Sequence, residues 1–127
     1  MISPAADTPS QHEQKVKDYV AAYNRRDIDA MLNMVSEDIQ WLSVDGDKIT
    51  VETKGKGPLR ESLAGYFKSS PSAQSTLEWI HATSARVAAH EKSTWKTKSG
   101  MKSQTSLSVY EFHQGLITRV YYYPAEK

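Results

Sequence analysis

The chain has 127 residues, of which 39% are hydrophobic, and its sixteen Lys and Arg residues nearly balance its fifteen Asp and Glu residues. This length and composition predict a soluble globular chain that buries roughly two-thirds of its unfolded surface in one core. Because the net charge is only +1, no overall field favours a nucleic acid or an acidic membrane surface.

Cysteine and long apolar runs are both absent. The lack of cysteine excludes disulfides, thiolate metal ligands and a cysteine nucleophile. It fits a reducing compartment, and the cytoplasm is therefore favoured, although a processed, exported form stays open. No apolar run reaches the ~18 residues of a membrane-spanning helix, so no membrane partner is expected.

The N-terminus is expected to be a flexible tail over residues 1–10, followed by a single domain over residues 11–127. The tail lacks the basic start and apolar core of a signal peptide. Ser10 and Glu13 match a capping box and predict a helix from there to about residue 25. Its apolar positions follow the helical spacing i, i+3, i+4, i+7, namely Val16, Tyr19, Val20 and Tyr23.

A second helix is predicted after Asp27, which is a good N-cap residue. Its apolar face would carry Ile28, Met31, Leu32 and Val35. From Ile39 the apolar period becomes two, which indicates a strand, and Asp45-Gly46 predicts a hairpin turn to a return strand. A third helix is expected to begin near Pro58.

The rest of the chain is strand-like, with turns at Ser99-Gly100 and Gln114-Gly115. The predicted strands span 75–83, 85–92, 93–98, 102–112 and 116–123. The order of helix, helix, hairpin, helix and a long meander predicts an α+β fold.

Four segments with this order and spacing resemble the nuclear transport factor 2-like superfamily, in its SnoaL-like polyketide cyclase and ketosteroid isomerase branch. They read YVAAYNRRD from Tyr19, SEDIQW from Ser36, GKG from Gly55 and YEFHQGLI from Tyr110. The resemblance implies a cone-shaped half-barrel in which three helices pack against a curved, mainly antiparallel sheet with mixed pairing at its edge. It also implies an apolar cavity and, often, a dimer through the outer face of the sheet.

Catalytic residues carry over only in part. The resemblance places the oxyanion tyrosine of ketosteroid isomerases at Tyr19, but the base and second acid positions fall on Ser43 and Ser108. A serine cannot act as a base near neutral pH without another base beside it, so standard ketosteroid isomerisation is not expected. Asp45 could replace the base but is better explained as a turn residue. If the protein is an enzyme, a question the sequence leaves open, the candidate catalytic residues are Tyr19 and His81.

Strand parity predicts which side chains face the cavity. If Ser108 faces inward, Ser106 and Tyr110 do so too. The predicted ligand-binding pocket is an aromatic cavity with a few hydroxyls, lined by Tyr19, Tyr23, Trp41, Ser43, Tyr66, Phe67, Ser108, Val120 and Tyr122. Such a lining suits a small apolar or cyclic ligand. The alternative is that these side chains simply fill the core.

The opposite parity predicts an apolar outer face. It would carry Thr105, Leu107, Val109, Ile117, Tyr121 and Tyr123, and a two-fold homodimer would cover it. Four lysines around the turn at residues 99–100 are interpreted as a charged hairpin tip that blocks edge pairing, and no nucleic-acid partner is expected. The four histidines show no paired ligand spacing, so neither a metal nor a cofactor is expected.

Two functions remain from the sequence. The first is a small-molecule-binding protein of the SnoaL-like class, which as an enzyme would be of the isomerase, cyclase or dehydratase type. The second is a non-catalytic homodimeric interaction module whose cavity is filled.

Overall fold

The computed structural model describes residues 8–124 and confirms the predicted α+β class. The helices are α1 (Pro9–Arg25), α2 (Ile28–Leu32) and α3 (Lys56–Ser69). The strands are β1 (Val35–Asp45), β2 (Lys48–Lys54), β3 (Gln74–Ala82), β4 (Arg86–Thr97), β5 (Gly100–His113) and β6 (Leu116–Tyr123). None of the helices in this part of the chain is long and apolar enough to span a membrane.

Helix α1 begins earlier than predicted. Its N-cap is Thr8 rather than Ser10: the Thr8 hydroxyl accepts a hydrogen bond from the Gln11 amide, and the Gln11 side chain accepts one from the Thr8 amide. Pro9 explains the shift, because proline favours the first helical position and keeps the residue before it extended. Residues 9 and 10, which were predicted to belong to the tail, therefore belong to α1. Residues 1–7 of the predicted tail lie outside the part of the chain that the structure describes.

Helix α2 is shorter than predicted, because Val35 belongs to β1 and not to the helix. Asp27 caps α2 as expected, accepting a hydrogen bond from the Ala30 amide at 3.1 Å. Val35 is fully buried and pairs with Ile117 of β6. An apolar side chain at position 35 would be buried whether the residue belonged to a helix or to a strand. The helical spacing of apolar residues therefore could not distinguish the helix from the strand here.

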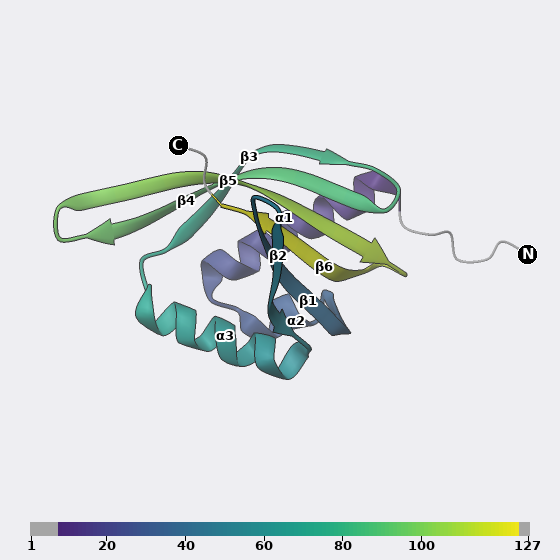
Figure 1. Ribbon diagram of the computed structural model, residues 1–127, viewed down its shortest axis with the longest axis horizontal. Helices are drawn as coiled ribbons and strands as arrows, with labels where there is room; N and C mark the ends of the chain where they lie inside the picture. Colours follow the sequence, from purple (N-terminus) through teal and green to yellow (C-terminus); the bar gives the residue numbers. More distant parts are fainter. Residues whose placement is uncertain (1–7, 125–127) are drawn as a thin grey trace, which may run out of the picture.

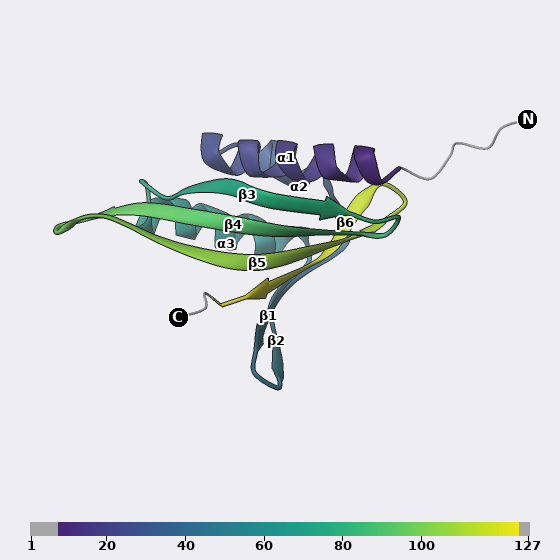
Figure 2. The same cartoon turned by 90° about the horizontal axis from the view of Figure 1, so that it is seen from above.

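The strands form a single curled sheet of order β2-β1-β6-β5-β4-β3. Strands β1 and β6 run parallel, and the other neighbouring pairs are antiparallel. Figure 1 shows α3 below the sheet and the β4–β5 hairpin reaching out beyond the rest of the molecule. Figure 2 shows α1 lying along β3, while the β1–β2 hairpin projects away from the other strands. The core lies between the helices and the sheet face that they cover.

Strand β4 is one continuous strand where two were predicted, over 85–92 and 93–98. It pairs with β5 without a break from Arg86–Glu111 to Thr97–Gly100. Backbone pairing between β4 and β5 continues along the whole of the long hairpin shown in Figure 1, so the polar side chains of its second half do not interrupt the strand.

A bulge changes the face of one predicted outer residue. Arg119 pairs with Glu111, but the next pair is Ile117 with Phe112, so Thr118 is an extra residue in β6. One extra residue turns the preceding side chains to the other face of a sheet. Ile117 was therefore wrongly predicted on the outer face, and it is fully buried in the core.

Candidate functional site

A cavity of about 610 Å³ opens between the helices and the sheet. Helices α1 and α3 contribute mostly aromatic and aliphatic side chains to its wall, and strands β4, β5 and β6 contribute hydroxyl groups. The aromatic members of the wall are Tyr19, Tyr23, Trp41, Tyr66, Trp95, Tyr110 and Tyr122. A space of this size, with a mainly apolar surface and polar groups among the aromatic side chains, is typical of small-molecule sites.

Most of the predicted pocket residues come together on this wall. They are Tyr19, Tyr23, Trp41, Ser43, Tyr66, Ser108 and Tyr122. Phe67 and Val120 are not part of the wall. Phe67 instead packs edge-on against Tyr23, at 5.3 Å between ring centroids, and under the Arg26 guanidinium, while Val120 is fully buried in the core.

The β5 wall of the cavity follows the predicted parity. Ser106, Ser108 and Tyr110 are buried and face inward, whereas Leu107 and Val109, which alternate with them, do not line the cavity. The Ser106 hydroxyl donates a hydrogen bond to the Tyr122 hydroxyl at 3.1 Å. The hydroxyl wall is therefore held by contacts between neighbouring strands.

Two buried hydrogen-bond donors on the cavity wall lack acceptors. The Tyr19 hydroxyl on α1 and the Trp41 indole Nε1 on β1 are both buried, and neither makes a well-formed hydrogen bond to another described residue. Burial raises the pKa of Tyr19 far above its usual value, and the nearby Trp41 N–H only partly offsets this. Tyr19 is therefore a neutral hydrogen-bond donor at physiological pH.

Glu91 is a carboxylate of the candidate site that the sequence analysis did not count among the pocket residues. It lies on β4 and lines the cavity. The Tyr110 hydroxyl donates to its Oε2 at 2.7 Å, and the Ser75 hydroxyl donates to its Oε1 at 3.1 Å. Asn24 at the end of α1 holds the Ser75 backbone through two hydrogen bonds of 2.8 Å. The sequence analysis therefore missed a carboxylate that faces the cavity.

The tyrosines around Glu91 are held in their neutral form. Burial is the main cause that raises the pKa of Tyr19, Tyr23 and Tyr110, and the negative charge of Glu91 raises each of the three further. Tyr110 is also the hydrogen-bond donor to Glu91, which requires its proton. These three tyrosines are therefore phenols and not phenolates at physiological pH.

His81 does not join this cluster. It is exposed on β3, where its ring stacks on Trp79 with 6.2 Å between centroids, and it does not line the cavity. Asp45 is exposed beside the turn between β1 and β2. Among residues 8–124, no group of three or more His, Asp or Glu side chains is placed to hold a metal ion.

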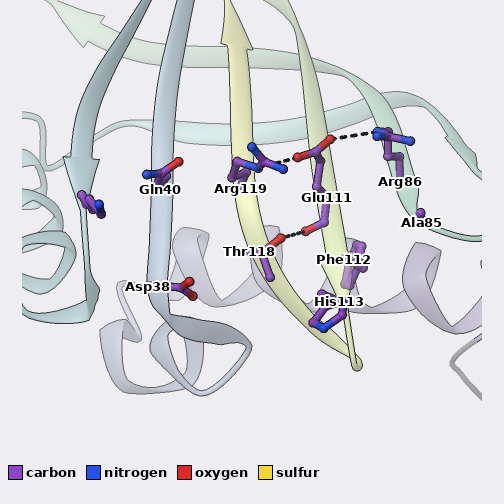
Figure 3. A pocket seen from close by; sticks show the side chains of 10 residues that line it. Asp38, Gln40, Ala85, Arg86, Glu111, Phe112, His113, Thr118 and Arg119 are labelled. Carbon is purple, nitrogen blue, oxygen red and sulfur yellow. Dashed lines mark hydrogen bonds and ion pairs between the residues drawn. The ribbon is translucent and has the colours of Figure 1, made fainter.

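A second hollow, of about 530 Å³, lies by the opposite face of the sheet (Figure 3). Its centre is Glu111, whose largely buried carboxylate forms ion pairs with Arg86 at 2.9 Å and Arg119 at 2.7 Å. These three side chains come from β4, β5 and β6 and face one another across the strands. Glu111 already neutralises much of the charge of the two arginines. We therefore interpret the charged side chains around this hollow as an ion-pair cluster that joins the strands, and not as a ligand site.

The curled, unclosed sheet wrapped around three helices defines the class of protein: it is the cone fold of the nuclear transport factor 2-like superfamily. Residues 16–120 match the SnoaL-like domain, and the chain belongs to this family. Both findings confirm the resemblance read from the sequence.

Solved structures share the fold at low sequence identity. A candidate ketosteroid isomerase from Kribbella flavida is 17% identical over 94% of this chain and 81% of its own, with a TM-score of 0.78. A candidate polyketide cyclase from Xanthomonas campestris is 22% identical over 93% of both chains, with a TM-score of 0.71. TerC, crystallised with polyporic acid, is 15% identical over 91% of this chain and 92% of its own, with a TM-score of 0.74. No curated protein matches the chain by sequence.

Proposed function

We propose that this protein binds a compact cyclic, mainly apolar small molecule in the cavity between α1, α3 and the sheet. The observation that carries the proposal is the pair of buried donors without acceptors, Tyr19 Oη and Trp41 Nε1, on the wall of a cavity of about 610 Å³. A buried donor without a partner costs about 1–3 kcal/mol. A ligand oxygen that accepts from both groups removes this cost.

The aromatic side of the cavity supports a planar ligand. Tyr23 and Tyr66 line it with ring centroids 6.2 Å apart, and Trp41 lies on the strand side. Aromatic side chains favour stacked or edge-on contacts with a flat ring. The crystallisation of TerC with polyporic acid supports a small organic ligand in a cavity of this fold.

The same donors suit catalysis of the isomerase, cyclase or dehydratase type. Neutral donors aimed at a ligand oxygen stabilise negative charge as it develops there. Tyr19 is the group proposed for this role, and Glu91 replaces His81 as the candidate base because it lies on the cavity wall. The alternative of an interaction module with a filled cavity is less well supported, since the side chains leave this volume open.

Replacing Tyr19 with phenylalanine tests the proposal. With 2-naphthylmethanol as a probe, we expect the dissociation constant to rise about tenfold, the effect of one lost hydrogen bond. The free energy of unfolding of the empty protein should change little, because the hydroxyl makes no well-formed hydrogen bond there. Calorimetric titration and denaturant unfolding measure the two quantities. Equal affinity in the two proteins would contradict the assignment.

Tyr110→Phe is the matched control for this substitution. It removes a hydroxyl of the same kind that does have a protein partner, Glu91. Its loss should therefore lower the free energy of unfolding by about 1–2 kcal/mol. The two variants separate a hydroxyl kept for a ligand from one that stabilises the fold.

We also propose a homodimer through the outer face of the sheet. Leu107 and Val109 lie opposite Tyr123 and Tyr121 across β5 and β6. Thr105 continues the row, and the face remains partly open to solvent. Leu107→Glu should convert the protein to a monomer in sedimentation experiments, because it places charges against each other across the two-fold axis. An unchanged sedimentation coefficient would rule out this interface.

A further inference from the structure

The charged side chains on the wall of the cavity are all acidic. Of the described residues that line it, the charged ones are Glu91 and Glu52, and none is Lys, Arg or His. The lysines and the histidine next to Glu91 in β4 alternate with it and lie off the wall. A ligand in this cavity therefore meets negative charge and no positive charge.

The Glu91 carboxylate has only neutral partners among the described residues. Its two hydrogen bonds come from the hydroxyls of Tyr110 and Ser75, and none of the ion pairs in residues 8–124 includes it. Arg26 is the cation beside Tyr23, but it lies off the wall and donates to backbone oxygens of Tyr23 and Pro71. A partly buried carboxylate of this kind is better stabilised by an opposite charge than by hydroxyls alone.

The rings near this carboxylate suit a cation as well. Tyr19 contacts Tyr110 edge-on, with 6.1 Å between centroids, and both line the cavity. Trp95 lies on the same face of β4 as Glu91, four residues further on. The faces of tyrosine and tryptophan attract ammonium groups, and most strongly where water is excluded.

We propose that the ligand of this cavity carries a positive charge, as a protonated amine or a quaternary ammonium group, placed against Glu91. This inference rests on the proposed function, since both place the ligand in the same cavity. The ligand would join three parts: a ring against the aromatic wall, an oxygen at Tyr19 and Trp41, and an ammonium group at Glu91. An anionic ligand is disfavoured, because no basic side chain on the wall would balance its charge.

Three probes that share the ring and a ring hydroxyl oxygen for Tyr19 test the inference on the wild-type protein: 6-(aminomethyl)-2-naphthol, 6-(hydroxymethyl)-2-naphthol and 6-hydroxy-2-naphthoate, titrated by calorimetry near neutral pH. We expect the amine to bind about tenfold more tightly than the alcohol, and the acid about tenfold more weakly. If the alcohol binds and the amine binds no better, the charge proposal fails and the proposed function stands. If none of the three binds, both fail.

Glu91→Gln locates the effect, because glutamine keeps the shape, its carbonyl oxygen accepts from one of the two hydroxyls, and its NH2 group can donate to the oxygen of the other. The preference for the amine over the alcohol should disappear, with little change in the affinity for the alcohol. Glu52→Gln is the matched control: this residue also lines the cavity but is exposed to solvent, so its charge is screened and the preference should change less than about twofold. A preference that survives Glu91→Gln would overturn the assignment. Should that variant fail to fold, the wild-type comparison of the probes decides alone.

Discussion

Replacing Ser108 with phenylalanine is expected to abolish ligand binding in the cavity while the protein stays folded. Ser108 is buried on β5, lines the cavity, and lies opposite Ala89 of β4 and Tyr122 of β6. A phenyl ring at this position must enter the open volume, because the strands beside it leave no other space. We expect the affinity for 2-naphthylmethanol to fall on the order of a hundredfold, since the ring and the probe overlap.

Leu107→Phe is the control, because it adds a ring at the neighbouring position on the opposite face of the same strand. Leu107 does not line the cavity, so the affinity for the probe should not change. Circular dichroism and thermal unfolding check that both variants fold. Normal probe binding by a folded Ser108→Phe variant would mean that the ligand does not occupy this cavity.

The second large effect concerns stability. Ile117→Ala should lower the free energy of unfolding by about 3 kcal/mol, within the range of about 2–5 kcal/mol for truncation of a fully buried aliphatic side chain. Ile117 is 0% exposed and packs in the core where β1 and β6 pair. Its neighbour Leu116 is 38% exposed, so Leu116→Ala should cost less than about 1 kcal/mol.

Urea unfolding of the two variants measures this difference directly. The comparison tests the bulge at Thr118, because without the bulge Ile117 would face outward. Equal losses of stability in the two variants would contradict the register of β5 and β6.

Much of the fold could be predicted from local pattern. Asp27 caps α2, and the hairpin that Asp45-Gly46 indicates forms with Gly46 and Asp47 as its turn and a positive φ at Gly46. The turn at Gln114-Gly115 has a positive φ at both residues. The alternation of Ser106, Ser108 and Tyr110 also gave the inward face of β5 correctly. These features depend on neighbours in sequence, so the sequence alone was sufficient.

The features that were missed depend on pairing between strands. The bulge at Thr118 depends on how β5 and β6 align, and no local sequence motif predicts it. Glu91 was missed because β4 was divided into two strands. A signal was available: the pair Thr97–Gly100 at the predicted turn aligns Glu91 with Ser106, which was already predicted to face inward. The register of one hairpin therefore would have located the cavity's carboxylate.

If a small molecule occupies the cavity beside Tyr19 and Trp41, the three tryptophans of the chain offer the most direct test of its presence. Trp41 and Trp95 line the cavity, whereas Trp79 is 53% exposed on β3 and does not. Titration with 2-naphthylmethanol can be followed through the three indole N–H signals in ¹H–¹⁵N spectra. We predict saturable shifts for Trp41 and Trp95 and none for Trp79. Shifts confined to Trp79, or no shift in any of the three, would contradict the account.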